Sequence, residues 1–268
     1  MIRVGVVGAA GRMGRTVCSA VAADPDLVFV CGVDSQASRA DGEILVEGIE
    51  VAERLHAFVD AECDVVVDFT VADAARATVP WLGLHGMHAV VGTTGFTDAD
   101  LELFESSFAR PGGAHPDPDG PNCLIAPNFA ISAVLMMRFA EMAAPWFDTA
   151  EVIELHHDRK IDAPSGTAVK TIERMAAARG SDFAPDPTQD EVYPGARGGV
   201  GPAGIRAHSV RMRGMVAHQE VILGTTGQSL TIRQDSYDRE SFMPGVLLAC
   251  KRIAHFPGVT LSLDPFLD

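Results

Sequence analysis

The residues best suited to chemistry lie in one short stretch, residues 154–167. It contains two adjacent histidines, His156 and His157, and a nearby lysine, Lys160. Histidine exchanges protons near neutral pH, and lysine can act as a fixed cation or as a proton donor. This spacing fits an anionic substrate bound next to a proton source.

The same stretch runs into a predicted helix start. Ser165, Gly166 and Thr167 follow a proline and supply hydroxyls and backbone N–H groups at the helix N-terminus, where a carboxylate can bind. The alternative is structural: Ser165 and Thr167 cap the helix, and one histidine packs while the other is solvated. The combination of residues favours the site, and the spacing is not that of a metal site.

A glycine pattern follows the first predicted strand. Gly8, Gly11 and Gly14 form G-x-x-G-x-x-G at the start of the first predicted helix, where small residues let a pyrophosphate approach the backbone. Asp34 ends the second predicted strand, where its carboxylate can accept hydrogen bonds from a ribose. Strand, loop, helix and acid in this order favour dinucleotide binding over a turn that merely needs glycine.

The nicotinamide cofactor stays open between NADH and NADPH. Asp34 disfavours a 2′-phosphate by charge repulsion, whereas Arg12 and Arg39 are near enough in sequence to compensate.

The elements that must position these residues alternate, up to about residue 127, between β-branched runs and helical patterns. The strand-like runs are residues 4–7, 27–33, 65–69, 88–91 and 123–126. This alternation predicts a parallel sheet with helices on both faces. Polar loops follow three of these runs, at residues 68–70, 92–95 and 126–129, and ligands bind at the carboxyl ends of such strands. Asn128 fits a carboxamide contact or a plain turn equally well.

The pattern changes after residue 128. A helix from about Ala130, a strand over 151–155 and a helix over 167–178 precede strand-like runs at 205–213, 216–223 and 230–234. Consecutive strands with short turns predict an antiparallel or mixed sheet. A last helix, 244–254, is expected to return to the first domain. Segments 110–121 and 180–204 lack structural periodicity, and a loop as long as the second is usually functional or disordered.

Composition limits the classes of partner. The 268 residues carry 36 acidic against 21 basic side chains, a formal charge of −15 that is the wrong sign for binding nucleic acid or an anionic membrane. The five cysteines are odd in number and scattered, which fits a reducing cytoplasm rather than a disulfide framework. No signal peptide or spanning segment is evident, so a soluble cytoplasmic protein is expected.

Together, these motifs resemble the 4-hydroxy-tetrahydrodipicolinate reductase (dihydrodipicolinate reductase) family of the bacterial diaminopimelate and lysine pathway. The resemblance covers essentially the whole length, and its most specific part is ELHH at 154–157 followed by KIDAPSGTA at 160–168. It implies an α/β fold with a Rossmann-type dinucleotide-binding domain, residues 1–127 plus 240–268. It also implies an α+β substrate-binding and oligomerisation domain with a mixed sheet, residues 128–239, which assembles a homotetramer.

The resemblance also implies the activity: NADH or NADPH reduces 4-hydroxy-tetrahydrodipicolinate, a cyclic dicarboxylate, to tetrahydrodipicolinate. By motif position, His156 is the expected proton donor or acceptor and Lys160 the proton donor. Substrate contacts are expected from His157, Lys160, Ser165, Gly166 and Thr167. Cofactor contacts are expected from Gly8, Ala9, Ala10, Gly11, Arg12, Met13, Asp34, Gly92, Thr93, Thr94, Ala126, Pro127, Asn128 and Phe129. No metal is expected.

Two of the departures from the family pattern lie beside expected site residues. Asp158-Arg159 stands where neutral or basic residues are expected, and Ser35 replaces the arginine that some members carry after the ribose acid. The second departure weakens the case for strong NADPH preference. Arg239 is either a further substrate contact or a surface residue.

Two other functions fit parts of the sequence. A dehydrogenase of another amino-acid intermediate, such as a semialdehyde, shares the dinucleotide signature, but the stretch 156–167 argues against it. A regulatory protein that senses nicotinamide dinucleotides without turnover would not need His156 and Lys160, and both are present.

Overall fold

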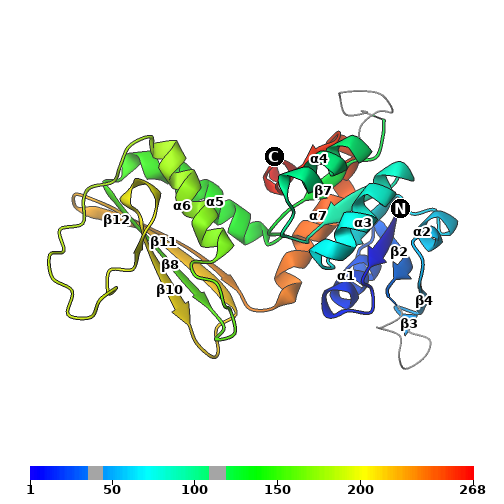
Figure 1. The fold of residues 1–268 in the computed structure, drawn as a ribbon, viewed down its shortest axis with the longest axis horizontal. Helices are drawn as coiled ribbons and strands as arrows, with labels where there is room; N and C mark the ends of the chain where they lie inside the picture. Colours follow the sequence, from blue (N-terminus) through cyan, green and yellow to red (C-terminus); the bar gives the residue numbers. More distant parts are fainter. Residues whose placement is uncertain (36–44, 109–118) are drawn as a thin grey trace. The chain divides into compact units, whose positions relative to one another are not determined.

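The computed structural model describes residues 1–35, 45–108 and 119–268. They form two compact units (Figure 1). Unit 1 comprises Met1–Phe129 and Phe242–Asp268, and unit 2 comprises Ala130–Ser241.

Unit 1 is built on a mostly parallel sheet. Within the described ranges its strand order is β13-β7-β6-β5-β1-β2-β4-β3. The strands are β1 (Ile2–Val7), β2 (Leu27–Val33), β3 (Leu45–Val46), β4 (Ile49–Ala52), β5 (Val65–Asp68), β6 (His88–Val91), β7 (Cys123–Ile125) and β13 (Val259–Thr260). Among the described strands of this sheet, only β3 pairs antiparallel, with β4. The order reverses at β1, which lies between β2 and β5, and open α/β sheets bind ligands at such a switch point. The predicted Rossmann-type sheet is confirmed.

The central strands of unit 1 are buried, which explains their β-branched composition: every residue of β5 is buried. The helices are α1 (Arg12–Ala23), α2 (His56–Asp60), α3 (Ala72–Leu84), α4 (Asp98–Ser107) and α7 (Met243–Arg252). Helix α1 buries Val17, Cys18 and Val21 at helical spacing. Helix α7 packs on α1, β1 and β6, so the end of the chain returns to the first unit as expected.

Unit 2 contains a mixed sheet covered by two helices. Its strands are β8 (Thr149–His156), β9 (Gly199–Val200), β10 (Arg206–Arg211), β11 (Ala217–Thr225) and β12 (Gln228–Ser236), in the order β12-β11-β8-β10-β9. Helices α5 (Ile131–Ala143) and α6 (Gly166–Arg179) pack against each other, and α6 also packs on β8. Strand β10 is parallel to β8, whereas β11 is antiparallel to it. The predicted mixed sheet is confirmed, but consecutive strands β10 and β11 are separated by β8.

The long segment 180–204 contains only β9 and a short 3-10 turn, η3 (Pro202–Gly204). Charged side chains fasten it to the sheet: Arg197 pairs with Glu151 on β8 and with Asp186, and Asp186 also pairs with Arg206 on β10. The segment is therefore irregular but bound to unit 2. No helix in the described ranges has both the length and the apolar character needed to cross a bilayer.

Candidate active site

The glycine loop joins β1 to α1 in unit 1. Gly8 has a φ of 71°, which favours glycine, and the N–H of Gly11 donates to its carbonyl oxygen at 2.9 Å. A Cβ on Gly14 would lie 2.0 Å from the same oxygen, so only glycine lets the helix pack this close to the loop. Gly11 precedes α1 without a capping side chain, and Gly11 and Arg12 are exposed. The start of α1 can therefore accept an anionic group, and this cradle fits a pyrophosphate.

Asp34 lies beside this loop. Its Oδ2 accepts a hydrogen bond from the backbone N–H of Ala10 at 2.9 Å, and its Oδ1 accepts one from Ser35 at 2.7 Å. Each carboxylate oxygen has a second lone pair, so the group can still accept hydrogen bonds from ribose hydroxyls. Arg39, the second predicted partner of a 2′-phosphate, lies outside the described residues.

The loops after β5 and β6 meet at the carboxyl edge of the sheet. The hydroxyl of Thr93 donates to the backbone oxygen of Thr70 at 3.1 Å. The fully buried carboxylate of Asp68 accepts hydrogen bonds from the backbone N–H and the hydroxyl of Thr70, at 2.8 and 2.6 Å. Burial raises the pKa of Asp68 despite these bonds. Asp68 therefore stabilises the loop that follows β5 through its hydrogen bonds to Thr70.

An aromatic contact links the segment after β7 to the loop after β5 at the same edge of the sheet. A Cβ on Gly92 would lie 2.1 Å from the ring of Phe69, and that ring lies 5.3 Å from the ring of Phe129, centroid to centroid. Thr94 and Pro127 are exposed, whereas Ala126 and Phe129 are buried. The three polar loops expected at the carboxyl ends of strands thus follow the neighbouring strands β5, β6 and β7 of one sheet, and direct cofactor contact is open to the exposed members of segments 92–94 and 126–129.

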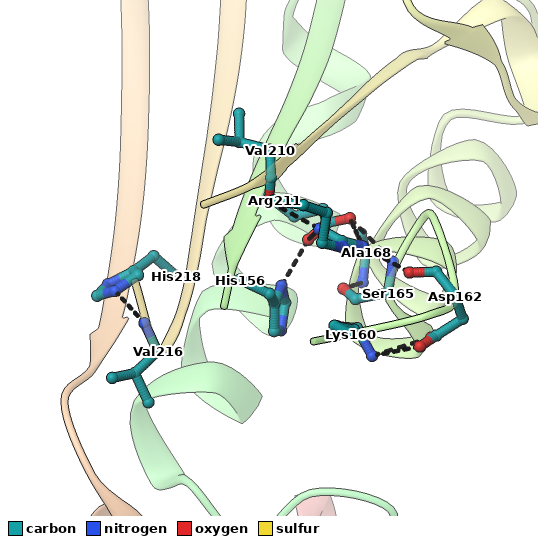
Figure 2. A network of polar contacts seen from close by, with 10 residues as sticks. His156, Lys160, Asp162, Ser165, Ala168, Val210, Arg211, Val216 and His218 are labelled. Carbon is teal, nitrogen blue, oxygen red and sulfur yellow. Dashed lines mark hydrogen bonds and ion pairs between the residues drawn. The ribbon is translucent and has the colours of Figure 1, made fainter. Parts of the chain in front are cut away.

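The histidine–lysine stretch lies in unit 2, between the end of β8 and the start of α6 (Figure 2). His156 ends β8, and its Nδ1 is 2.5 Å from Oε2 of Glu154. Burial lowers the pKa of His156, the Glu154 carboxylate opposes this, and the positive charges of Lys160 and Arg211 add to the lowering. The neutral imidazole is therefore favoured near neutral pH.

Lys160 is paired within its own segment. Its Nζ lies 2.9 Å from both carboxylate oxygens of Asp162 (Figure 2). This hydrogen-bonded ammonium holds the pKa of Asp162 below its usual range. His157 accepts a hydrogen bond at Nδ1 from the backbone N–H of Arg159, at 3.3 Å. An anionic ligand must therefore compete with the Asp162 carboxylate for the Lys160 ammonium group.

The start of α6 combines a capping serine with an exposed glycine. Ser165 is the N-cap of α6, and its Oγ accepts a hydrogen bond from the N–H of Ala168 at 3.2 Å. Its own N–H donates to Oε1 of Glu154, so it is not available to a ligand. Gly166 is exposed, and a Cβ there would meet no atom within 4 Å. Open space thus lies before the first turn of α6, whose leading N–H groups have no acceptor within the helix.

Two residues to which the sequence gave no role are central to this cluster. Glu154 is fully buried, and Arg211 donates to its two oxygens at 2.7 and 2.8 Å. One signal was present: Glu154 and His156 are two residues apart on a strand and so share a face. Nothing in the sequence indicated Arg211, because only the parallel pairing of β10 with β8 places it opposite His156.

The fold and the two groups of residues define a nicotinamide-dinucleotide-dependent oxidoreductase. Unit 1 supplies the switch-point sheet, the glycine loop and Asp34, and unit 2 carries the ionisable His156–Lys160 segment. Within the described residues, no group of three or more His, Cys, Asp or Glu side chains could hold a metal ion.

The chain belongs to the dihydrodipicolinate reductase family. Residues 2–129 match the family model for the N-terminus of dihydrodipicolinate reductase, and residues 132–267 match the model for its C-terminus. The 4-hydroxy-tetrahydrodipicolinate reductases of Corynebacterium urealyticum and Nocardia farcinica are 48% and 49% identical to it. Each match covers 100% of this chain and 99% of the relative.

Solved structures give the same family. A dipicolinate-bound dihydrodipicolinate reductase from Paenisporosarcina sp. TG-14 is 36% identical, with a TM-score of 0.82 and 99% coverage of both chains. An aspartate semialdehyde dehydrogenase II from Vibrio cholerae reaches a TM-score of 0.54 at 10% identity, which is a likeness of fold alone. The family resemblance expected from the motifs is confirmed.

Proposed function

We propose that this protein reduces 4-hydroxy-tetrahydrodipicolinate to tetrahydrodipicolinate with NADH or NADPH. The observation that carries the proposal is the segment from His156 to Gly166, where a proton-exchanging ring, an ammonium group and an open helix start lie on one unit of a chain whose full length matches 4-hydroxy-tetrahydrodipicolinate reductases. The Paenisporosarcina relative was solved with dipicolinate, a planar dicarboxylate, which supports a dicarboxylate ligand for this chain.

The reaction exchanges a hydroxyl group for hydrogen, so it consumes one hydride and one proton and releases water. The nicotinamide supplies the hydride when bound. In unit 1, the loop from Gly8 to Met13 would hold the pyrophosphate, and Asp34 the adenosine ribose. The exposed parts of segments 92–94 and 126–129 would line the nicotinamide end.

Unit 2 supplies the proton and holds the substrate. Gly166 and Thr167 would bind one carboxylate at the start of α6, with Lys160 and His157 on its cationic side. His156 and Lys160 would exchange the proton with the substrate ring and the departing hydroxyl. Arg239 is exposed at the start of η4 (Arg239–Phe242), where it is either a further contact or a surface residue.

The setting proposed for this activity is a cytoplasmic homotetramer assembled through unit 2. Neither nucleic acid nor membrane is a partner in this proposal, because the formal charge of −15 opposes binding to polyanions.

The test is an absorbance assay of NADH and NADPH oxidation with freshly made 4-hydroxy-tetrahydrodipicolinate. Turnover with either nucleotide is expected, and an aspartate semialdehyde in place of the substrate serves as the control for the other dehydrogenase class. Binding of the nucleotide without turnover of the dicarboxylate would instead support a nucleotide-sensing protein.

A further inference from the structure

Glu154 is a buried carboxylate in the layer between the sheet and α6 of unit 2. On the adjacent strand β11, Glu154 is paired with Gln219, which is also buried. The Nε2 of Gln219 donates a hydrogen bond to the hydroxyl of Thr171 in α6 at 2.8 Å. A buried carboxylate is costly unless it is paired and hydrogen-bonded. The partners of Glu154 therefore show what keeps its charge in place.

Several donors meet on this one side chain. Arg211 donates to both oxygens, the backbone N–H of Ser165 donates to Oε1, and Nδ1 of His156 lies against Oε2. Burial opposes ionisation of Glu154, but the hydrogen bonds from Arg211, Ser209 and His156 outweigh it and keep its pKa below the usual value. Glu154 is thus an anion that links the end of β8 to the start of α6.

The anion determines which nitrogen of His156 carries the proton. An ionised carboxylate can only accept hydrogen bonds, so Nδ1 must be the donor at 2.5 Å. Nε2, on the other side of the ring, has no hydrogen-bond partner among the described residues. In the neutral ring Nε2 is therefore unprotonated, and it is the nitrogen that can take up or release a proton.

Arg211 fixes the other side of Glu154. Besides the two bonds to the carboxylate, it donates to the backbone oxygen of Asp162 at 2.7 Å, on the segment that carries Lys160 (Figure 2). One guanidinium group therefore binds both the carboxylate that orients His156 and the backbone next to Lys160. A planar guanidinium suits this double contact better than an ammonium would.

We propose that Glu154, clamped by Arg211, is the positioning residue of the active site, fixing His156 as the Nδ1-protonated tautomer with Nε2 open to the substrate. The inference rests on the proposed function for its kinetic consequences, but the state of the His156 ring can be observed without turnover. Besides Glu154 on β8, the charged groups that act on this ring are Lys160, after β8, and Arg211 on β10.

The chain offers a matched control on the same strand. Glu151 also binds an arginine and a histidine, Arg197 and His208, with the His208 Nε2 at 2.7 Å from its carboxylate. Glu151→Gln therefore removes the same kind of charge from the same strand without touching His156.

The experiment combines NMR of ring nitrogens with kinetics on the full-length protein. The wild type should show His156 as the Nδ1-protonated tautomer, its signals being identified by their loss in His156→Gln. Glu154→Gln should mix the tautomers, lower the His156 pKa further because the opposing carboxylate charge is lost, and reduce kcat about 10²-fold with KM changed less than about threefold. Glu154→Asp, which keeps the charge, should retain the wild-type tautomer, and Glu151→Gln should leave tautomer and kcat unchanged.

Two results would overturn the proposal: an Nε2-protonated His156 in the wild type, which needs no variant to detect, or wild-type kcat and tautomer in folded Glu154→Gln. Thermal melting and NADH binding establish that each variant is folded. A wild type that binds NADH and pyridine-2,6-dicarboxylate but does not turn over would contradict the proposed function, while the tautomer measurement would still decide the role of Glu154.

Discussion

The backbone N–H of Ala10 donates a hydrogen bond to Oδ2 of Asp34 at 2.9 Å, so the acid that follows β2 and the glycine loop that follows β1 hold each other in place. Asp34 therefore has two tasks in the proposed cofactor site. It accepts hydrogen bonds from the ribose, and it stabilises the loop that receives the pyrophosphate.

We expect NADH to be used at least as well as NADPH, since the carboxylate of Asp34 attracts a ribose diol and repels a 2′-phosphate. Asp34→Ala should weaken the binding of both nucleotides, because the glycine loop loses its hydrogen bond to Asp34. The binding of NADH should weaken more than that of NADPH. Fluorescence titration with each nucleotide measures this, with Asp60→Ala, an exposed acid of the same unit, as the control. A wild type that uses NADPH alone would refute this interpretation of Asp34.

Gly14→Ala tests the packing of the glycine loop. The new Cβ would lie 2.0 Å from the Gly8 oxygen and 2.8 Å from the Ala9 Cα, so the loop must shift. We expect a loss of about 1–3 kcal/mol in the free energy of unfolding and weaker nucleotide binding. Urea denaturation and nucleotide titration measure the two effects. Gly199→Ala, where a Cβ meets nothing within 4 Å, should change neither, and equal behaviour of the two variants would contradict the prediction.

Removing either ionisable group of unit 2 should impair the chemical step. His156→Ala or Lys160→Ala is expected to lower kcat by roughly 10²–10⁴ while the Kd for NADH changes little, because both residues lie outside the dinucleotide unit. Steady-state kinetics and calorimetry with NADH separate the two quantities. Wild-type turnover in either variant would remove that residue from the proposed mechanism.

The pairing of Lys160 with Asp162 predicts opposite effects on dicarboxylate binding. Lys160→Ala should weaken the binding of pyridine-2,6-dicarboxylate by about 2–5 kcal/mol, because a charged partner of the ligand is lost. Asp162→Asn should strengthen the binding of this dicarboxylate about two- to fivefold, because the Lys160 ammonium is no longer paired with the carboxylate of Asp162. Calorimetry in the presence of NADH tests both. Equal affinity of the wild type and Lys160→Ala would place the anion site elsewhere.

A third variant at this site, Thr167→Val, should cost roughly 1 kcal/mol in the same titration, because it removes only one hydroxyl. An unchanged affinity would mean that the Thr167 hydroxyl does not contact the dicarboxylate.

The buried carboxylate of Glu154 predicts a pH-dependent stability. Its folded pKa lies below its unfolded value of about 4.3, so it stabilises the fold above that pH, and the contribution is lost as the pH falls through the folded pKa. Glu154→Gln should therefore be about 1–3 kcal/mol less stable than the wild type at pH 7, with the gap starting to narrow below about pH 4. Urea denaturation across this range measures it. Glu173→Gln, in a surface pair with Lys170, should show almost no gap, and a Glu154→Gln gap that keeps its full size from pH 7 down to pH 3 would be inconsistent with this account.

Local sequence features determined much of this protein. The glycine pattern with Asp34 indicated the dinucleotide loop because a strand, a tight turn and a helix start are local structures, each set by a few neighbouring residues. The runs at 27–33 and 88–91 match β2 and β6 at both ends, since buried parallel strands are continuous β-branched segments. The short strands β3, β4, β9 and β13 were not anticipated, because runs of two to four residues carry little periodicity.

Only the tertiary structure decided how the site is held. The sequence placed His156, Lys160 and Ser165 in one segment, but it did not show that Lys160 would pair with Asp162 or that Ser165 would donate its N–H to Glu154. Arg211 is far away in the chain, and the parallel pairing of β10 with β8 brings it to Glu154. Such contacts depend on strand register and on a buried charge that requires partners, and neither is encoded in the residues next to it. The sequence by itself therefore determined which groups are the candidates for the chemistry, and the fold decided which of them are already paired, because burial and distance exist only once the strands are assembled.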